Sequence, residues 1–221
     1  MLKDRLRIEP SSASLHSPNN RKSGAGQPLN RASNGLDQFF SSLQDQESLS
    51  ILDFSGASQA NISFITSMGH RIYSNDALRT LEEAFGTGGD FITNQSDPER
   101  AGLFLRENLE FPDRTFDGAL IWDTLQFLAP PLLQDTVDRL YRILRPQSSL
   151  LAFFHADEKA QTAPLFSYRI VESKVMSLTP RNQERPVQYF NNRSLEKLFQ
   201  KFNSVKFFLT RDHLREVIVR R

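Results

Sequence analysis

The chain has 221 residues, of which 38% are hydrophobic and 24% charged, a length and composition sufficient for one domain with a full core. Its 27 basic and 26 acidic residues leave a formal net charge of +1, which argues against nucleic acid as a partner because no global field would attract it. The absence of cysteine excludes disulfides, thiolate metal sites and a cysteine nucleophile, and no apolar run approaches the length of a membrane span.

The first 35 residues have the composition of a disordered tail. The stretch EPSSASLHSPNNRKSGAGQPLNRASNG is rich in Ser, Asn, Gly and Pro, and it has too few apolar residues to build a core. The N-terminus has no hydrophobic segment typical of secretion, so we expect a cytoplasmic protein. We therefore expect a tail over 1–35 and one domain over 36–221.

Helix and strand patterns alternate after the tail. Apolar spacing and helix-start residues predict helices over 35–44, 59–68, 76–85, 130–144 and 194–202, with another starting near 97. Short apolar runs predict strands over 50–54, 70–75, 90–94, 117–123 and 149–155, and a final hairpin over 204–211 and 216–221. This alternation indicates crossover connections and a mostly parallel sheet that ends in an antiparallel pair.

Residues 155–191 are long for a simple connection. They contain FSYRIVESKVMSLTP and RPVQYF, which suggest an added hairpin or lid. Its aromatic residues, Phe166, Tyr168, Tyr189 and Phe190, are candidates either for a substrate pocket or for packing that pins the lid down.

Four stretches, in this order, resemble class I S-adenosylmethionine-dependent methyltransferases, and most strongly their type 11-like group. They are ILDFSGAS, GHRIYSNDA, FPDRTFDGALIWDTLQFL and LYRILRPQSSLLAFF. The resemblance covers about residues 37–221. It implies an α/β Rossmann-like methyltransferase fold, with a mostly parallel seven-stranded sheet, a C-terminal antiparallel hairpin and helices on both faces. It also implies S-adenosylmethionine as cofactor and a small-molecule acceptor. The charge balance and the lack of a long apolar run argue against nucleic acid and a membrane as partners.

The loop after the first strand departs from the family. Its glycines would stand at positions 55, 57 and 59, where this chain has Ser55, Ala57 and Gln59, and Gly56 is one position out of the pattern. Glycine in such a turn permits positive φ and close approach of a ligand. Two alternatives follow: a working cofactor loop with unusual residues, or a non-catalytic binding or regulatory protein of this fold.

The resemblance assigns the cofactor-binding candidates. Asp53, at the end of the first strand, would orient the loop or meet the methionine amino group; otherwise it caps loop amides. The loop residues Ser55, Gly56 and Ala57 would lie beside the cofactor. Asp76, after the second strand, would accept both ribose hydroxyls, since a carboxylate can take two donors; alternatively it is the N-cap of the next helix.

The catalytic residue stays unassigned, because in methyl transfer the cofactor carries the reactive group and the protein mainly orients. Trp122 and Asp123 follow the fourth strand, where the family lines the transfer site. Asp123 is a candidate to contact the cofactor, fix the substrate or act as a base, with turn formation as the alternative. His155 is the other catalytic candidate. With Asp157 and Glu158 it has no evident further ligand, so no metal is predicted.

Other positions are assigned by their place in the pattern. Glu107 and Asn108 stand near the spacing of the adenine-contacting acid, and Asp117 is expected at the opposite end of the sheet. His70 and His213 are expected at the surface. The turn after the fourth strand lacks the Asn/Asp-Pro-Pro-aromatic motif of amino-group methylation of bases or glutamine. The missing G-x-G-x-x-G argues against a nicotinamide enzyme.

Overall fold

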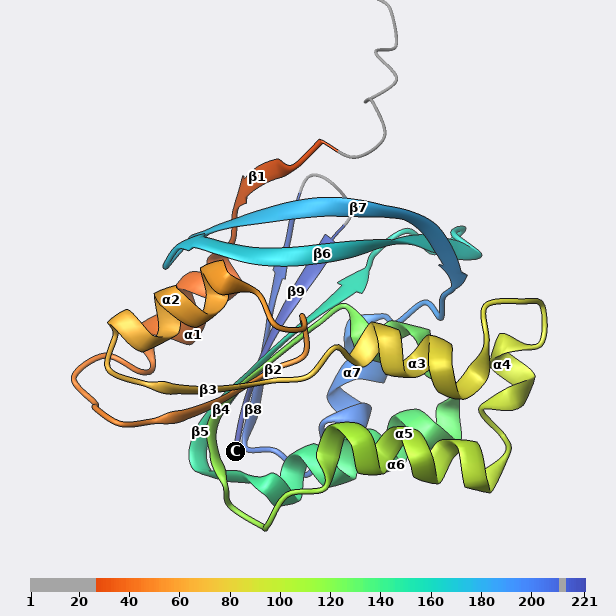
Figure 1. Cartoon of the computed structure of the whole chain (residues 1–221), viewed down its shortest axis with the longest axis horizontal. Helices are drawn as coiled ribbons and strands as arrows, with labels where there is room; N and C mark the ends of the chain where they lie inside the picture. Colours follow the sequence, from red (N-terminus) through yellow and green to blue (C-terminus); the bar gives the residue numbers. More distant parts are fainter. Residues whose placement is uncertain (1–26, 211–213) are drawn as a thin grey trace, which may run out of the picture.

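The computed structural model describes residues 27–210 and 214–221. Its larger sheet has six strands in the order β3-β2-β4-β5-β9-β8 (Figure 1). Neighbours are parallel from β3 to β5, and β9 runs antiparallel to both β5 and β8. The strands are β2 (Ser50–Asp53), β3 (Arg71–Ser74), β4 (Phe116–Trp122), β5 (Leu144–His155), β8 (Ser204–Leu209) and β9 (Leu214–Arg220).

Helices cover both faces of this sheet. In Figure 1, α1 and α2 lie on one side, and α3, α5 and α6 lie on the other. The expected α/β architecture, with a mostly parallel sheet and a C-terminal antiparallel hairpin, is confirmed. The helices are α1 (Asn34–Ser41), α2 (Gln59–Ser67), α3 (Ala77–Phe85), α4 (Phe91–Asn94), α5 (Pro98–Leu109), α6 (Pro130–Ile143) and α7 (Asn192–Leu198), with a 3₁₀ turn η1 (Thr124–Phe127).

Side chains at the helix starts explain where the helices begin. Asp76 accepts a hydrogen bond from the Arg79 amide at the start of α3, and Asp97 accepts from the Glu99 and Arg100 amides at the start of α5. These bonds satisfy amides that have no partner inside the helix.

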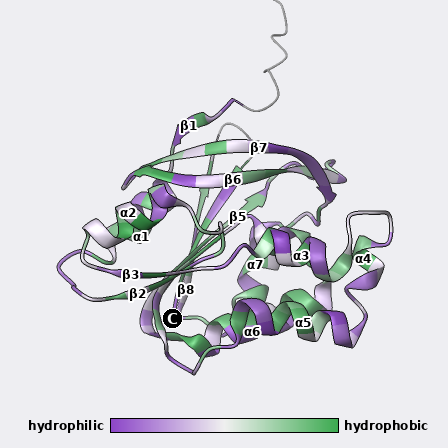
Figure 2. Ribbon diagram, viewed as in Figure 1, coloured by the Kyte–Doolittle hydropathy of each residue, from purple (hydrophilic) through white to green (hydrophobic). Residues whose placement is uncertain are grey.

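Apolar side chains fill the space between the sheet and its helices. The central strands β4 and β5 are buried along most of their length, because helices cover both faces of the sheet. Figure 2 shows this apolar centre, and it shows the outer part of β7 (Val175–Pro186) as hydrophilic.

The larger sheet has six strands, so the expectation of seven is wrong. Residues 90–94, expected as a strand, contain the short helix α4 instead. Phe91 packs edge-on against Phe85 with ring centroids 6.4 Å apart, and the side-chain amide of Asn94 donates to the Phe85 backbone carbonyl at 2.9 Å. These local contacts hold the segment against the end of α3, so β3 forms the edge of the sheet.

The expected tail also ends too late. Residues 1–26 lie outside the described residues, but strand β1 (Leu29–Ala32) pairs antiparallel with β7, and α1 begins at Asn34. Pairing along a sheet edge uses backbone groups, so it needs no apolar run in the sequence.

A long hairpin, β6 (Thr162–Glu172) and β7, forms the second sheet together with β1. It is the added hairpin that the sequence predicted between 155 and 191, and it lies across the carboxyl ends of the parallel strands (Figure 1). Asn61 of α2 attaches it, because its side-chain oxygen Oδ1 accepts a hydrogen bond from the Ile170 backbone amide at 2.7 Å. The hairpin therefore covers the end of the sheet at which the loop after β2 lies.

Two expectations about histidines have different outcomes. His70 is buried rather than at the surface, and burial lowers its pKa. His213 lies outside the described residues. Within the described ranges, no helix is long and apolar enough to cross a membrane.

Candidate functional site

The loop between β2 and α2 needs one glycine. Of residues 55–58, Gly56 alone has a positive φ, at 84°. A Cβ at this position would lie 3.2 Å from both Cβ and Oδ2 of Asp76, which is closer than nearly all real contacts. Ser55 and Ala57 form the turn without positive φ, so the missing family glycines impose no backbone strain at these two positions.

Asp53 lies beneath this loop, fully buried, with four donors. Its Oδ1 accepts from the Ser55 amide at 2.9 Å and from the Trp122 indole N–H at 2.6 Å. Its Oδ2 accepts from the Ser55 hydroxyl and the Asn61 amide, both at 2.9 Å. Burial raises the pKa of Asp53, and these hydrogen bonds counteract the rise. The carboxylate therefore fixes the loop, the end of β4 and the start of α2 relative to one another.

Asp76 faces the same loop from the start of α3. Its Oδ1 accepts from the Arg79 amide at 3.1 Å and lies 3.6 Å from Nη2 of Arg181, on the hairpin. The Asp76 backbone also bridges to Ser55. The N-cap alternative is thus present, and it leaves Oδ2 turned toward Gly56.

A cavity of about 420 Å³ lies between this loop and the hairpin. This is within the range of small-molecule sites. Gln59 is exposed, and its amide donates to the Ser63 hydroxyl at 3.0 Å, along α2. The cavity is lined by Ser55, Gly56, Ala57, Ser58, Gln59, Ala60, Asp76, Ser167, Tyr168, Arg169 and Arg181.

The first turn of α2 opens onto this cavity without a side-chain cap. The N-cap residue Ser58 makes no capping hydrogen bond, and the first turn carries no acid. Its free amides and the positive end of the helix dipole favour an anionic group at this place.

Asp123 follows β4 and is buried, and neither of its oxygens has a hydrogen-bond partner among the described residues. Burial raises its pKa to about 7, and the neighbouring Tyr168 hydroxyl and Arg181 guanidinium counteract the rise. Burial also raises the pKa of Tyr168, as does the nearby Asp123. A buried carboxyl group that titrates near neutral pH has the properties of a general base.

A second cavity, of about 240 Å³, is mostly apolar and contains both catalytic candidates. Tyr168 lines this cavity and the larger one, so the two are neighbours. The His155 ring accepts the Asp157 amide at Nδ1, so its neutral form carries the proton on Nε2. The lining residues are Leu29, Arg31, Asp123, Gln126, His155, Ala163, Pro164, Phe166, Tyr168, Leu178 and Leu214.

The region around His155 offers no metal centre. Across 27–210 and 214–221, no group of three or more His, Cys, Asp or Glu side chains could hold a metal ion.

The adenine candidates lie in α5 rather than after a strand. Asn108 is buried, and its amide donates to the Thr80 hydroxyl at 2.7 Å. The side-chain amide of Asn75 donates to the backbone carbonyls of Glu107 and Asn108, which ties the end of β3 to α5. Neither Glu107 nor Asn108 lines the larger cavity.

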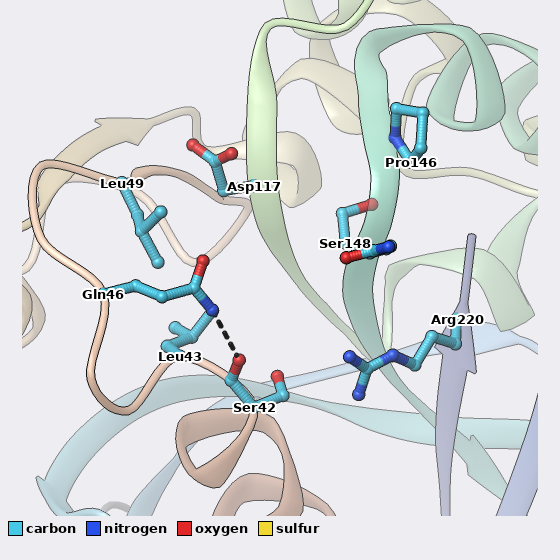
Figure 3. A pocket seen from close by; sticks show the side chains of 9 residues that line it. Ser42, Leu43, Gln46, Leu49, Asp117, Pro146, Ser148 and Arg220 are labelled. Atoms are coloured by element: carbon cyan, nitrogen blue, oxygen red, sulfur yellow. Dashed lines mark hydrogen bonds between the residues drawn. The ribbon is translucent and has the colours of Figure 1, made fainter.

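Asp117 lies at the opposite end of the sheet, as expected. Both of its oxygens are 2.8 Å from Nη1 of Arg145, and it accepts from the Ser50 amide at 2.9 Å. A polar cavity of about 100 Å³ adjoins it, between the segment after α1 and the start of β5 (Figure 3). This cavity is too small for a nucleotide-sized ligand.

Sequence reasoning missed Arg181 and Asn61. Both residues join the hairpin to the rest of the domain. Arg181 of β7 lies 3.6 Å from Asp76, and Asn61 of α2 accepts a hydrogen bond from Ile170 of β6. Asparagine inside a predicted helix carries low intrinsic preference, and that was the available signal for Asn61. Arg181 gave none, because its partner lies 105 positions earlier in the chain.

No protein-family model and no curated protein sequence matches this chain. Solved structures do match, and many are S-adenosylmethionine-dependent methyltransferases. The 1,6-didemethyltoxoflavin N1-methyltransferase of Burkholderia thailandensis, with 1,6-didemethyltoxoflavin and S-adenosylhomocysteine bound, is 14% identical with a TM-score of 0.48, and the match covers 85% of this chain and 76% of that one.

Two archaeal methyltransferase structures match to a similar degree. For the Methanosarcina mazei protein the identity is 19%, the TM-score 0.46, and the coverage 80% of this chain and 93% of that one. For the Archaeoglobus fulgidus protein the values are 11%, 0.48, 84% and 91%. Identities and TM-scores of this size transfer no activity, substrate or site residue to this chain.

Proposed function

We propose that this chain is an S-adenosylmethionine-dependent methyltransferase that acts on a small-molecule acceptor. The observation that carries the proposal is the pairing of two neighbouring cavities at the carboxyl ends of the parallel strands. The larger, at the Gly56 turn, has the size of a small-molecule site, and the smaller contains the unpartnered carboxylate of Asp123. Ligands of open α/β sheets bind at this end of the strands.

The residues around the larger cavity suit the proposed cofactor. The Gly56 backbone packs directly against the side chain of Asp76, whose Oδ1 caps α3 and whose Oδ2 is available to the ribose hydroxyls. The uncapped amides of α2 suit the methionine carboxylate. Asp53, with four donors, supports the loop instead of meeting the ligand.

When bound, the cofactor supplies a methyl group on a positively charged sulfur. The chain's own residues then orient and exclude water. Asp123 is positioned to accept the proton that the acceptor loses, since its carboxyl group is buried beside the second cavity.

Calorimetric titration tests the proposal. We expect saturable binding of S-adenosylmethionine and of its demethylated product, S-adenosylhomocysteine. The absence of heat with either compound at millimolar concentration would overturn the methyltransferase assignment. Binding of both compounds without turnover on any acceptor would favour the non-catalytic alternative.

Asp76→Ala tests the ribose assignment against a matched control. Loss of a hydrogen bond to a charged group should cost about 1.5–3 kcal/mol of binding free energy. Asp97→Ala removes an equivalent N-cap at α5, away from the lining of the cavity. Both variants should lose about 1 kcal/mol of stability, but Asp97→Ala should bind like the unaltered chain. Equal affinity of the two variants would refute the assignment.

A further inference from the structure

The smaller cavity combines apolar walls with two polar groups that lack partners. Its apolar walls come from β1, from the hairpin and from β9. The two oxygens of Asp123 and the hydroxyl of Tyr168 are buried and interact with each other, but none of the three makes a well-formed hydrogen bond to a described residue. A buried carboxylate without partners costs free energy in the folded chain. A ligand that satisfies it would recover that cost.

The other polar residues of this cavity, Arg31, Gln126 and His155, each already interact with a neighbouring residue. Arg31 pairs with Glu216 at 3.0 Å. The side-chain oxygen Oε1 of Gln126 accepts from the His155 backbone amide at 2.7 Å, and His155 Nδ1 accepts from the Asp157 backbone amide. Among the described lining residues, Asp123 and Tyr168 are the ones whose buried polar atoms lack a well-formed hydrogen bond.

The volume limits the size of the ligand. An apolar protein cavity of roughly 150 Å³ binds benzene. At about 240 Å³, this cavity has room for one ring with a short substituent.

We propose that this cavity binds the methyl acceptor, and that the acceptor is a small, largely apolar molecule whose amine or hydroxyl group donates a hydrogen bond to Asp123. That the bound molecule is a methyl acceptor rests on the proposed function, but the binding preference of the cavity does not. In the transfer, the acceptor nitrogen or oxygen bonds the methyl carbon, the methyl–sulfur bond breaks with its electron pair kept by sulfur, and the acceptor's proton passes to Asp123.

The preference follows from the chemistry of a carboxylate. Above its pKa of about 7, Asp123 is ionised and only accepts hydrogen bonds, so a donor satisfies it, whereas a hydrocarbon leaves it unpaired and an anion is repelled. Sites built to pair a polar group discriminate strongly against analogues that lack the matching group.

Four probes of one size test this preference: phenethylamine, phenethyl alcohol, propylbenzene and phenylacetate. Their dissociation constants are measured by ligand-observed NMR at a pH well above the pKa of Asp123, where its carboxyl group is ionised. No cofactor is present, so the result is independent of S-adenosylmethionine binding. At least one donor probe should bind about tenfold or more tightly than propylbenzene, and phenylacetate should bind most weakly. The tighter donor identifies an amine or a hydroxyl acceptor. Equal affinities of the donors and propylbenzene would overturn the proposal.

Variants assign the preference to Asp123. Asp123→Leu should reduce both donors to the affinity of propylbenzene, and Asp113→Leu, at an exposed acid at the other end of β4, should leave the preference intact. Ala163→Leu keeps the carboxylate but places a larger side chain in the cavity lining, and it should abolish binding of every probe. Donor preference retained in Asp123→Leu, or probe binding retained in Ala163→Leu, would place the probes elsewhere and refute the proposal.

Discussion

The indole ring of Trp122 lies almost parallel to the phenol ring of Tyr168, with centroids 5.0 Å apart and an interplanar angle of 11°. Trp122 ends β4, and Tyr168 lies on β6, so the stack joins the sheet to the hairpin above it. The same indole donates to Asp53, beneath the loop. One side chain thus links the sheet to the hairpin and to the buried carboxylate that supports the loop of the larger cavity.

Trp122→Phe should separate the hydrogen bond from the packing. Phenylalanine keeps an aromatic ring in the stack but cannot donate to Asp53. We expect a loss of about 1–3 kcal/mol in the free energy of unfolding, the cost of removing a donor from a buried carboxylate. Urea unfolding followed by circular dichroism measures it, since the variant has no tryptophan fluorescence.

A double-mutant cycle with Asp53→Asn checks the mechanism. If the bond carries the effect, the two changes should be non-additive by more than about 0.5 kcal/mol. Additive effects would show that Trp122 acts through packing alone.

Gly56→Ala should impair both stability and cofactor binding. Alanine at positive φ costs about 1–2 kcal/mol, and its Cβ would also press against Asp76. Because the turn would have to shift, we expect S-adenosylmethionine affinity to fall at least about tenfold, by the loss of one hydrogen bond to a charged group.

Gly69→Ala is the control for backbone strain. Gly69 has φ of 83°, and a Cβ there would meet no atom within 4 Å. This variant should lose comparable stability in thermal unfolding and keep normal affinity in calorimetry. Equal affinities for the two variants would mean that the Gly56 turn does not shape the cofactor site.

The sequence predicts the helices and strands correctly where the interactions that form them are local. Helix starts at Asp76 and Asp97 were readable because an N-cap acts within three residues. The buried strands were readable because strands covered on both faces form continuous apolar runs. The placement of Asp53 at the end of the first strand followed from the same pattern.

The features that the sequence did not predict depend on contacts between residues far apart in the chain. Strand β1 depends on backbone pairing with β7, about 150 positions away, and composition holds no trace of such pairing. The segment 90–94 contains β-favouring residues, but packing of Phe91 on Phe85 decided its helical turn. The four donors to Asp53 include Trp122, 69 positions away, so its saturation was invisible in the sequence.

Glu216 holds the N-terminal strand to the sheet and should be costly to replace. It is buried on β9, and it accepts from Arg31 at 3.0 Å, from the Ser33 hydroxyl at 3.0 Å and from the Gly35 amide at 2.6 Å. Glu216→Gln removes the charge that pairs with Arg31. We expect a loss of about 3–5 kcal/mol, as for other broken buried pairs.

Hydrogen exchange shows which segments lose protection in Glu216→Gln. Amides of β1 and of the start of α1 should exchange faster in Glu216→Gln, since these segments carry its partners. Glu83→Gln breaks an exposed pair with Arg79 and should change stability by at most about 1 kcal/mol. Unchanged exchange in β1 would show that pairing with β7 suffices to hold it.

The stability of the chain should depend on pH through Asp123. Its pKa is about 7 in the folded chain against an ordinary 3.8, so between these values the folded state keeps a proton that the unfolded state has released. The free energy of unfolding should therefore fall as pH rises from about 4 to about 7, by at most roughly 1.4 kcal/mol per unit, and level off above.

Asp123→Asn isolates this contribution, because asparagine does not titrate. Asp53, whose pKa is also raised by burial, adds a slope of the same sign in both proteins, so it cancels in the difference between them. Urea unfolding at a series of pH values should show Asp123→Asn gaining stability relative to the unaltered chain as pH rises to about 7, whereas Asp113→Asn should run parallel to the unaltered chain. Parallel curves for Asp123→Asn as well would mean that Asp123 ionises normally in the folded chain, because a carboxyl group with equal pKa values in both states adds no pH dependence.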